Sequence, residues 1–166
     1  MTTNVHGTTI LIGRAGEALG APADAGVLLL GESGAGKSDL ALRLIERGAV
    51  LVADDRTELF VRDHALMAKA VPGLEGLLEV RGVGIIELPR AAEARIVLSV
   101  LLAIGANTLR LPPTHYYEAP PSLALPQDLR PPILHLAPFE ASAPAKVIAA
   151  VAAHAKALFR DSRKSV

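Results

Sequence analysis

A glycine-rich segment carries the strongest chemical signal in the chain. Residues 31–38 read Gly-Glu-Ser-Gly-Ala-Gly-Lys-Ser and match the pattern G-x-x-x-x-G-K-[ST] in full. Glycines in this pattern let backbone N–H groups face phosphate oxygens, and the N-terminus of a following helix adds positive charge. Lys37 would reach the terminal phosphates, while the Ser38 hydroxyl would ligate magnesium. We therefore predict that a nucleoside triphosphate and Mg²⁺ bind at Gly31, Glu32, Ser33, Gly34, Ala35, Gly36, Lys37 and Ser38.

Two adjacent carboxylates follow the next apolar run. Ala49–Ala53 is continuously apolar and ends in Asp54 and Asp55, as expected of a central strand that delivers carboxylates at its C-terminal edge. Phosphoryl transfer needs such a group, because catalysis is mainly alignment and neutralisation of phosphate charge. Neighbours on an extended strand point to opposite sides, so one Asp could face Lys37 and the metal and the other an acceptor hydroxyl. The alternative is that either Asp merely begins a turn.

The elements that must position these residues alternate between apolar strands and amphipathic helices. Apolar residues recur at three- and four-residue spacing after the glycine-rich segment, and Gly48 is well placed to end that helix. The predicted strands are Thr8–Ile12, Val27–Leu30, Ala49–Ala53, Leu59–Val61, Leu66–Val71, Ile96–Ala103 and Ile133–Leu136. The predicted helices are Lys37–Arg47 and a C-terminal helix with Val147, Ile148, Val151, Ala155, Leu158 and Phe159 on one face.

Composition favours one α/β domain with a mixed β-sheet flanked by helices. The 166 residues are 51% hydrophobic but only 3% aromatic, which indicates a core of Ala, Val, Leu and Ile. We predict that this domain spans residues 1–166, with a frayed tail over 160–166. The proline-rich segment 111–138 is expected to be an extended surface connection. Within it, residues 115–118 are predicted to form a packed loop cap, with a partner-binding loop as the alternative.

Charge and cysteine usage exclude several kinds of protein. Seventeen basic residues balance seventeen acidic ones, so no overall field would hold the chain on nucleic acid or on an anionic membrane. The absence of cysteine excludes disulfides, thiolate metal sites and cysteine nucleophiles. The sequence shows neither a basic-then-apolar leader nor an apolar run long enough to cross a bilayer. A cytoplasmic protein without nucleic-acid or membrane partners is therefore expected.

Three segments together resemble the catalytic domain of the HPr kinase/phosphorylase family. The first runs from the glycine-rich segment through Ile45-Glu46-Arg47-Gly48 to Leu51-Val52-Ala53-Asp54-Asp55. The second, residues 79–86, reads Glu-Val-Arg-Gly-Val-Gly-Ile-Ile and is similar to the family signature E-[IV]-R-G-[LV]-G-I-I. The third is His6-Gly7, at the family's distance upstream of the glycine-rich segment. The resemblance covers residues 6–92.

The resemblance implies a P-loop kinase-like fold and an ATP-dependent kinase that phosphorylates a serine of HPr, the phosphocarrier of the phosphotransferase system. In that family the Asp matching Asp55 acts as general base on the seryl hydroxyl, and the Lys matching Lys37 binds the transferring phosphate. The resemblance places His6 and Arg110 in the active site, although an ordinary surface arginine is the alternative for Arg110. The predicted magnesium ligands are Ser38, Glu79 and Asp54.

The chain also departs from the family pattern. Only five residues precede His6, whereas full-length relatives carry an additional N-terminal domain, so the chain resembles the short, catalytic-domain-only members. The family's C-terminal Pro/Arg/Gly/Asn-rich motif is tied to dephosphorylation, but Leu136–Ser142 has no basic residue. We therefore expect kinase activity with weak or absent phosphorylase activity.

The resemblance also implies a homo-oligomer, which is a hexamer in the family. Two other functions stay open at this point. One is a P-loop kinase of small molecules, which would turn over ATP without HPr. The other is a non-catalytic nucleotide sensor, which would need no acceptor-side base beside Lys37.

Overall fold

The computed structural model describes residues 1–160, so all but the first residue of the expected frayed tail lies outside the described residues. The strands are β1 (Thr2–Leu11), β2 (Ala25–Leu30), β3 (Val50–Ala53), β4 (Arg56–Arg62), β5 (Ala65–Ala70), β6 (Leu77–Val80), β7 (Gly84–Glu87), β8 (Glu93–Leu102), β9 (His115–Tyr116) and β10 (Pro132–Leu136). The helices are α1 (Lys37–Glu46) and α2 (Ala143–Lys156), with short 3₁₀ segments at Gly13–Leu19, Pro121–Leu123 and Gln127–Leu129.

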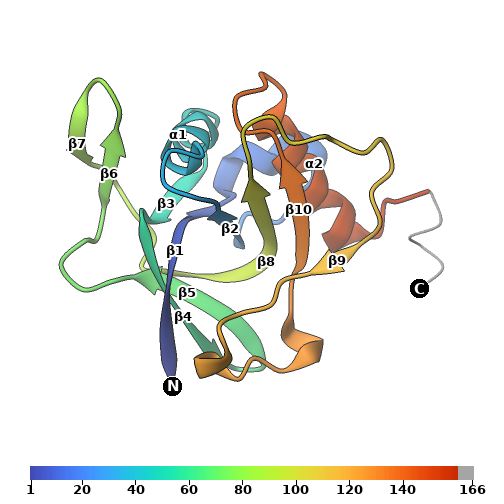
Figure 1. Ribbon diagram of the computed structural model, residues 1–166, viewed down its shortest axis with the longest axis horizontal. Helices are drawn as coiled ribbons and strands as arrows, with labels where there is room; N and C mark the ends of the chain where they lie inside the picture. Colours follow the sequence, from blue (N-terminus) through green and yellow to red (C-terminus); the bar gives the residue numbers. More distant parts are fainter. Residues whose placement is uncertain (161–166) are drawn as a thin grey trace.

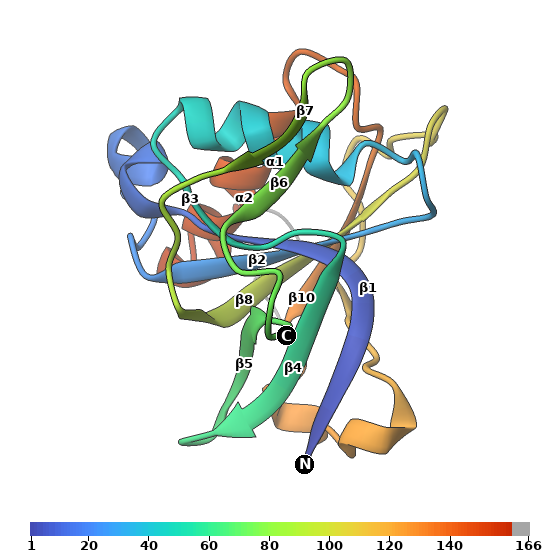
Figure 2. The ribbon, with the colours of Figure 1, turned by 90° about the vertical axis from the view of Figure 1, so that its left-hand side faces the viewer.

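The long strand β1 organises the main sheet. Its first half pairs with β4 and its second half with β2 and β3, all antiparallel. β2 then runs parallel to β8, and β8 runs parallel to β10. β5 pairs with both β4 and β8, so hydrogen-bonded neighbours run from β1 through β4, β5, β8 and β2 back to β1. The mixed sheet therefore curls. Figure 2 shows β4, β5 and the first half of β1 extending below the layer of helices. This topology places the middle of β1, at Thr9, beside the end of β3 at Ala53.

Two hydrophobic clusters fill the space around the sheet. The larger lies under both helices, where Leu40 and Leu44 of α1 and Val147 and Val151 of α2 pack against β1, β2 and β8. Figure 1 shows α1 and α2 on the same side of these strands. The smaller cluster joins side chains of β2, β4, β5 and β8 to the proline-rich segment. The predicted mixed α/β sheet flanked by helices is confirmed, while a single domain over residues 1–166 stays a prediction because it extends beyond the described residues.

The connections between strands follow their local chemistry. Asp63 and His64 both have positive φ, at 52° and 57°, and they form the two-residue turn between β4 and β5. Such turns match the right-handed twist of the flanking strands. Residues 77–87 form a separate two-stranded hairpin, β6–β7, which holds the Glu-Val-Arg-Gly signature. The hairpin lies beside α1 and outside the main sheet (Figure 1).

Two expectations about the C-terminal half are wrong. The proline-rich segment is not only a surface connection, because Tyr117, Leu123 and Leu125 are buried in the smaller cluster. Apolar side chains in a segment without periodicity still bury wherever a sheet face is open. The last helix ends at Lys156, where Ala157 adopts a left-handed conformation, so Leu158 and Phe159 lie beyond it. Within the helix, Ala155 is exposed.

Candidate functional site

The glycine-rich segment forms a loop between β2 and α1, as its pattern predicts. Gly36 has a φ of 92° and directly precedes Lys37, the first residue of α1. Gly31 has a φ of 149°, and a Cβ added there would lie 2.8 Å from the carbonyl oxygen of Leu102. Only glycine tolerates both the backbone conformation and this close approach. The loop therefore sits tightly on the end of β8, with the N-terminus of α1 free to face an anion.

The Lys37 side chain lies over the loop, and only 6% of the residue is exposed. Its Nζ donates to the carbonyl oxygens of Gly31 at 2.8 Å and Glu32 at 2.9 Å, and it lies 3.2 Å from Nε2 of His6. Burial lowers the pKa of Lys37, and the nearby carboxylates of the two strand-end aspartates oppose that shift. A phosphate arriving in the loop would find a cation already fixed in place.

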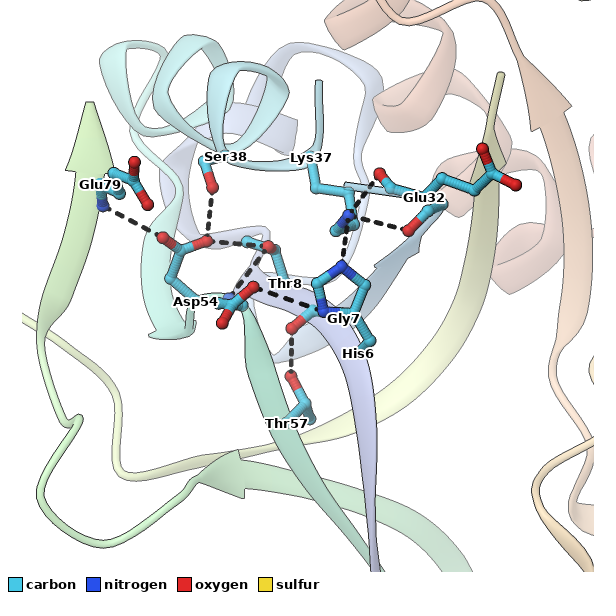
Figure 3. A network of polar contacts seen from close by, with 11 residues as sticks. His6, Gly7, Thr8, Glu32, Lys37, Ser38, Asp54, Thr57 and Glu79 are labelled. Carbon is cyan, nitrogen blue, oxygen red and sulfur yellow. Dashed lines mark hydrogen bonds and ion pairs between the residues drawn. The ribbon is translucent and has the colours of Figure 1, made fainter. Parts of the chain in front are cut away.

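Asp54 is buried beneath the loop and accepts three hydrogen bonds. The donors are the hydroxyl of Ser38 at 2.7 Å, the hydroxyl of Thr8 at 2.8 Å and the backbone N–H of Glu79 at 3.1 Å. Figure 3 shows them converging on the Asp54 carboxylate. This carboxylate therefore ties together the start of α1, the middle of β1 and the hairpin strand β6.

The donor set around Asp54 fits Mg²⁺. Hydroxyl and carboxylate oxygens are the ligands that this cation prefers. The Ser38 oxygen keeps lone pairs for a cation while its hydrogen points at Asp54. Within residues 1–160 no group of three or more His, Cys, Asp and Glu side chains could hold a metal by itself. This suits Mg²⁺, which usually takes one or two protein carboxylates together with substrate phosphates and water. Ser38, Asp54 and Glu79 would hold it.

Asp55 differs from Asp54 in both conformation and environment. Its φ is 64°, a left-handed conformation that costs a non-glycine residue energy and concentrates at functional sites. The backbone N–H of Gly7 donates to its carbonyl at 3.0 Å, and the side chain is 67% exposed. Nδ1 of His6 lies 3.4 Å from its carboxylate. The expected divergence of the two aspartates is present, but a left-handed residue produces it in place of strand alternation.

One pocket of about 260 Å³ brings most of the predicted residues together. Arg110 is exposed on the segment between β8 and β9 and does not line this pocket, so its predicted role stays a prediction. Asp54 is buried behind the pocket wall, under Ser38. The predicted residues that line the pocket are His6, Ser33, Gly34, Gly36, Lys37, Ser38, Asp55 and Glu79.

Sequence reasoning assigned no role to several residues of the site, among them Arg81, Thr8 and Phe139. Arg81 lines the pocket from the β6–β7 hairpin, and its place inside the Glu-Val-Arg-Gly signature was the available signal. Thr8 is fully buried on β1 and donates to Asp54, and a polar residue in a strand next to His6 could have suggested this. Phe139 lines the pocket from beyond β10, and nothing in the local pattern signals it.

Tyr116 lines a second pocket with Thr114, His115, Glu118, Gln127 and Arg130, whereas the adjacent Tyr117 is buried in the smaller hydrophobic cluster. Burial raises the pKa of Tyr117 to about 12, while its neighbour Tyr116 is 57% exposed. Residues 115–118 therefore include one packed side chain, as the loop-cap interpretation expects.

Among the described residues, no helix is both long and apolar enough to span a bilayer.

Comparison with known proteins places the chain in a family. Residues 4–99 match the family described as HPr Serine kinase C-terminal domain. The HPr kinase/phosphorylase of Lactobacillus delbrueckii subsp. bulgaricus is 50% identical over 64 residues, which are 38% of this chain and 20% of that protein. The HPr kinase/phosphorylase of Clostridium acetobutylicum is 47% identical over 74 residues, which are 45% of this chain and 24% of that protein. The aligned part thus spans about a fifth to a quarter of these curated relatives.

A solved structure shows the same fold. The Hpr(Ser) kinase/phosphatase from Coxiella burnetii superposes with a TM-score of 0.71 and covers 94% of this chain and 92% of that chain, at 22% sequence identity. At this identity the likeness is one of fold. Because the family match spans more than half of the chain and includes β1, the phosphate loop, the strand-end aspartates and the signature hairpin, the chain belongs to the HPr Serine kinase C-terminal domain family.

Proposed function

We propose that this protein is an ATP- and Mg²⁺-dependent kinase that transfers the γ-phosphoryl group to a serine of HPr, the phosphocarrier of the phosphotransferase system. The observation that carries the proposal is the position of Asp55. An exposed carboxylate lies at the phosphate pocket and is linked through His6 to the buried amine of Lys37. A nucleotide sensor would not need a carboxylate facing the open side of its phosphate loop.

Each group would act at a definite atom. Asp55 would accept the proton of the seryl hydroxyl as that oxygen attacks the γ-phosphorus and the bond to the ADP oxygen breaks. Lys37 and the loop N–H groups would stabilise the negative charge on the transferring phosphoryl group. Ser38, Asp54 and Glu79 would hold Mg²⁺, which supplies further charge neutralisation. His6 would orient the Asp55 carboxylate toward the incoming hydroxyl.

The basicity of Asp55 need not be high. An ordinary aspartate is a weak base, but the hydroxyl becomes acidic only as its oxygen bonds to phosphorus, so a correctly placed acceptor suffices. Placement is what the left-handed backbone at Asp55 and the 3.4 Å contact with His6 provide. The transfer leaves the proton on Asp55 until solvent removes it.

We propose that HPr docks on the β6–β7 hairpin. Val83 and Ile85 on this hairpin are 74% and 70% exposed, although both are apolar. Arg81 and Glu79 of the same hairpin line the pocket, so a protein bound there would stand next to Asp55. Exposed apolar side chains at the rim of an active site are common docking contacts. The acceptor serine would enter from this side.

The reverse reaction is proposed to be weak or absent. Phosphorylase activity requires inorganic phosphate to bind beside phosphoserine. Among the described residues that line the pocket, the lysine and arginine side chains are Lys37 and Arg81, and the 136–142 segment adds neither. We further propose that the protein works in the cytoplasm as a homo-oligomer, with the hexamer of the family as the expected size. Light scattering of the purified protein would give this size.

A transfer assay with labelled ATP, Mg²⁺ and purified HPr tests the main proposal. Acid-stable phosphoserine on HPr is expected with the wild-type protein and is expected to disappear in Lys37→Ala. Omission of Mg²⁺ should also abolish the label. Binding of ATP without any transfer to HPr would contradict the proposal and favour a sensor. Transfer to a small metabolite in place of HPr would favour a small-molecule kinase.

A further inference from the structure

Phe139 lies at the phosphate pocket but takes no part in the proposed transfer. Its side chain lines the pocket and is 56% exposed. A Cβ added at Gly36 would lie 3.0 Å from Cζ of Phe139, so the ring packs directly against the last glycine of the phosphate loop. Among the described residues that line the pocket, it is the single Phe, Tyr or Trp side chain. A partly exposed aromatic ring thus stands beside the loop.

The backbone on both sides of this ring is fixed to the helices. Arg43 of α1 donates from Nη1 to the carbonyl of Glu140 at 3.1 Å and from Nη2 to the carbonyl of Pro138. The Arg43 guanidinium is itself held by Asp39 at 3.0 Å. Lys146 of α2 pairs with the Glu140 carboxylate at 2.7 Å. These contacts bracket Phe139 and keep its ring at the loop, although more than half of the residue is exposed.

The position of the ring also fits the path of a nucleotide. Phosphates held by the loop N–H groups and Lys37 leave the nucleoside to extend out of the loop. The β6–β7 hairpin and the segment containing Phe139 lie on opposite sides of α1 (Figure 1). If the acceptor approaches beside the hairpin, the nucleoside would extend on the other side of α1, toward Phe139. A purine placed there would meet a preformed aromatic surface, and base–aromatic stacking needs no hydrogen-bond partner.

We propose that Phe139 is the platform on which the base of the bound nucleoside triphosphate stacks, with Arg43 as the residue that positions it. The inference rests on the proposed ATP site and extends it to the nucleoside. The platform would contact the base and the loop would contact the phosphates, so their contributions to binding can be measured separately. Removing the ring should therefore weaken binding of ATP without changing binding of a ligand that has phosphates alone.

Calorimetric titration of ATP and of inorganic tripolyphosphate, each with Mg²⁺, tests this claim. Phe139→Ala is expected to weaken ATP binding by about tenfold or more, on the scale of one base–aromatic stack, and to leave tripolyphosphate binding unchanged. Tyr116→Ala is the matched control, because Tyr116 is 57% exposed and lies away from the phosphate pocket. This control should bind both ligands like the wild-type protein.

The absence of tryptophan from the chain allows a direct readout of stacking. Phe139→Trp should show fluorescence quenching when ATP is added and none when tripolyphosphate is added. If Phe139→Ala loses affinity for ATP and for tripolyphosphate equally, the inference is overturned, because the ring would then only support the loop. Unchanged ATP binding would overturn it as well. A wild-type protein that binds tripolyphosphate as tightly as ATP contradicts the platform but keeps the phosphate site, whereas one that binds neither contradicts the proposed function itself.

Discussion

His6 contacts the carboxylate of Asp55 through Nδ1, at 3.4 Å. The other ring nitrogen, Nε2, lies 3.2 Å from the amine of Lys37. A protonated amine can only donate, so a charged Lys37 would donate to Nε2 and leave Nδ1 to face Asp55. The imidazole thus connects the group that would bind the transferring phosphoryl to the group that would receive the acceptor proton. His6 would therefore position both the Lys37 amine and the Asp55 carboxylate for the proposed reaction.

The first prediction concerns the proton acceptor. Asp55→Asn should lower the rate of phosphoryl transfer to HPr by about a hundredfold or more, which is the usual scale for loss of a general base. ATP affinity should change little. Asparagine keeps the shape of the side chain and tolerates the left-handed conformation that Asp55 adopts, so the backbone should not move. Single-turnover transfer rates and ATP titrations would separate the two effects.

A second left-handed aspartate provides the control for that experiment. Asp63 has a φ of 52° in the exposed turn between β4 and β5, and it does not line the phosphate pocket. Asp63→Asn removes one carboxylate in the same backbone conformation and should leave transfer unaffected. Equal losses of activity in both variants would count against a chemical role for Asp55.

The second prediction concerns the hydrogen bonds to Asp54, the buried carboxylate beneath the loop. Thr8→Val removes a hydroxyl that donates to the Asp54 carboxylate at 2.8 Å and receives the backbone N–H of Asp55 at 3.5 Å. Hydrogen bonds to charged groups contribute about 1.5–3 kcal/mol, so the free energy of unfolding should fall by about that amount. Urea denaturation would measure it.

Thr9→Val is the matched substitution one residue further along β1. Thr9 is equally buried, but its hydroxyl pairs with that of Thr57 and meets no charge. Thr57 can still donate to the carbonyl of Gly7 at 3.1 Å after the change. The expected cost is about 1 kcal/mol or less. If both substitutions cost the same, Asp54 does not depend on Thr8 in the way we describe.

Much of the site could be predicted because its parts are contiguous motifs. The loop 31–38, the strand end at Asp54 and Asp55 and the hairpin 79–86 each carry a local pattern. The fold then brings residues from all three motifs into one pocket with His6. The order of apolar strands and amphipathic helices also indicated the mixed sheet. Local pattern was sufficient wherever the chemistry itself required a fixed spacing.

The remainder depends on contacts between distant segments. Thr8 meets Asp54 because β1 pairs with β3, and no spacing in the sequence encodes this register. Phe139 reaches Gly36 because β10 lies parallel to β8 and Arg43 fixes the following residues. The burial of Tyr117 follows from an uncovered face of the sheet. Such features arise from packing, which overrides local propensity.

The third prediction uses the titration of Lys37. Burial lowers the pKa of its amine, and only the charged form attracts phosphate. ATP affinity should therefore be constant while Lys37 is protonated and should fall as the pH rises through the pKa of the free protein, below the ordinary lysine value. Fluorescent ATP titrations across the alkaline range would show this decline.

Lys37→Arg provides the comparison for the alkaline limb. The guanidinium stays charged at every accessible pH, so any binding that remains in this variant should be independent of pH over the same range. The arginine has a different shape, so a lower affinity overall is expected. A decline in Lys37→Arg that parallels the wild-type curve would assign the titration to another group.

The fourth prediction concerns the proposed docking surface for HPr on the β6–β7 hairpin. Val83→Asp and Ile85→Asp should each raise the KM for HPr by about tenfold or more, because apolar contacts at the centre of an interface commonly contribute at least that much. Both side chains are more than two-thirds exposed, so the fold and ATP binding should be unaffected. Ile104→Asp is the control, since Ile104 is 69% exposed and does not line the phosphate pocket. If Ile104→Asp impairs HPr phosphorylation and the hairpin variants do not, the acceptor docks elsewhere.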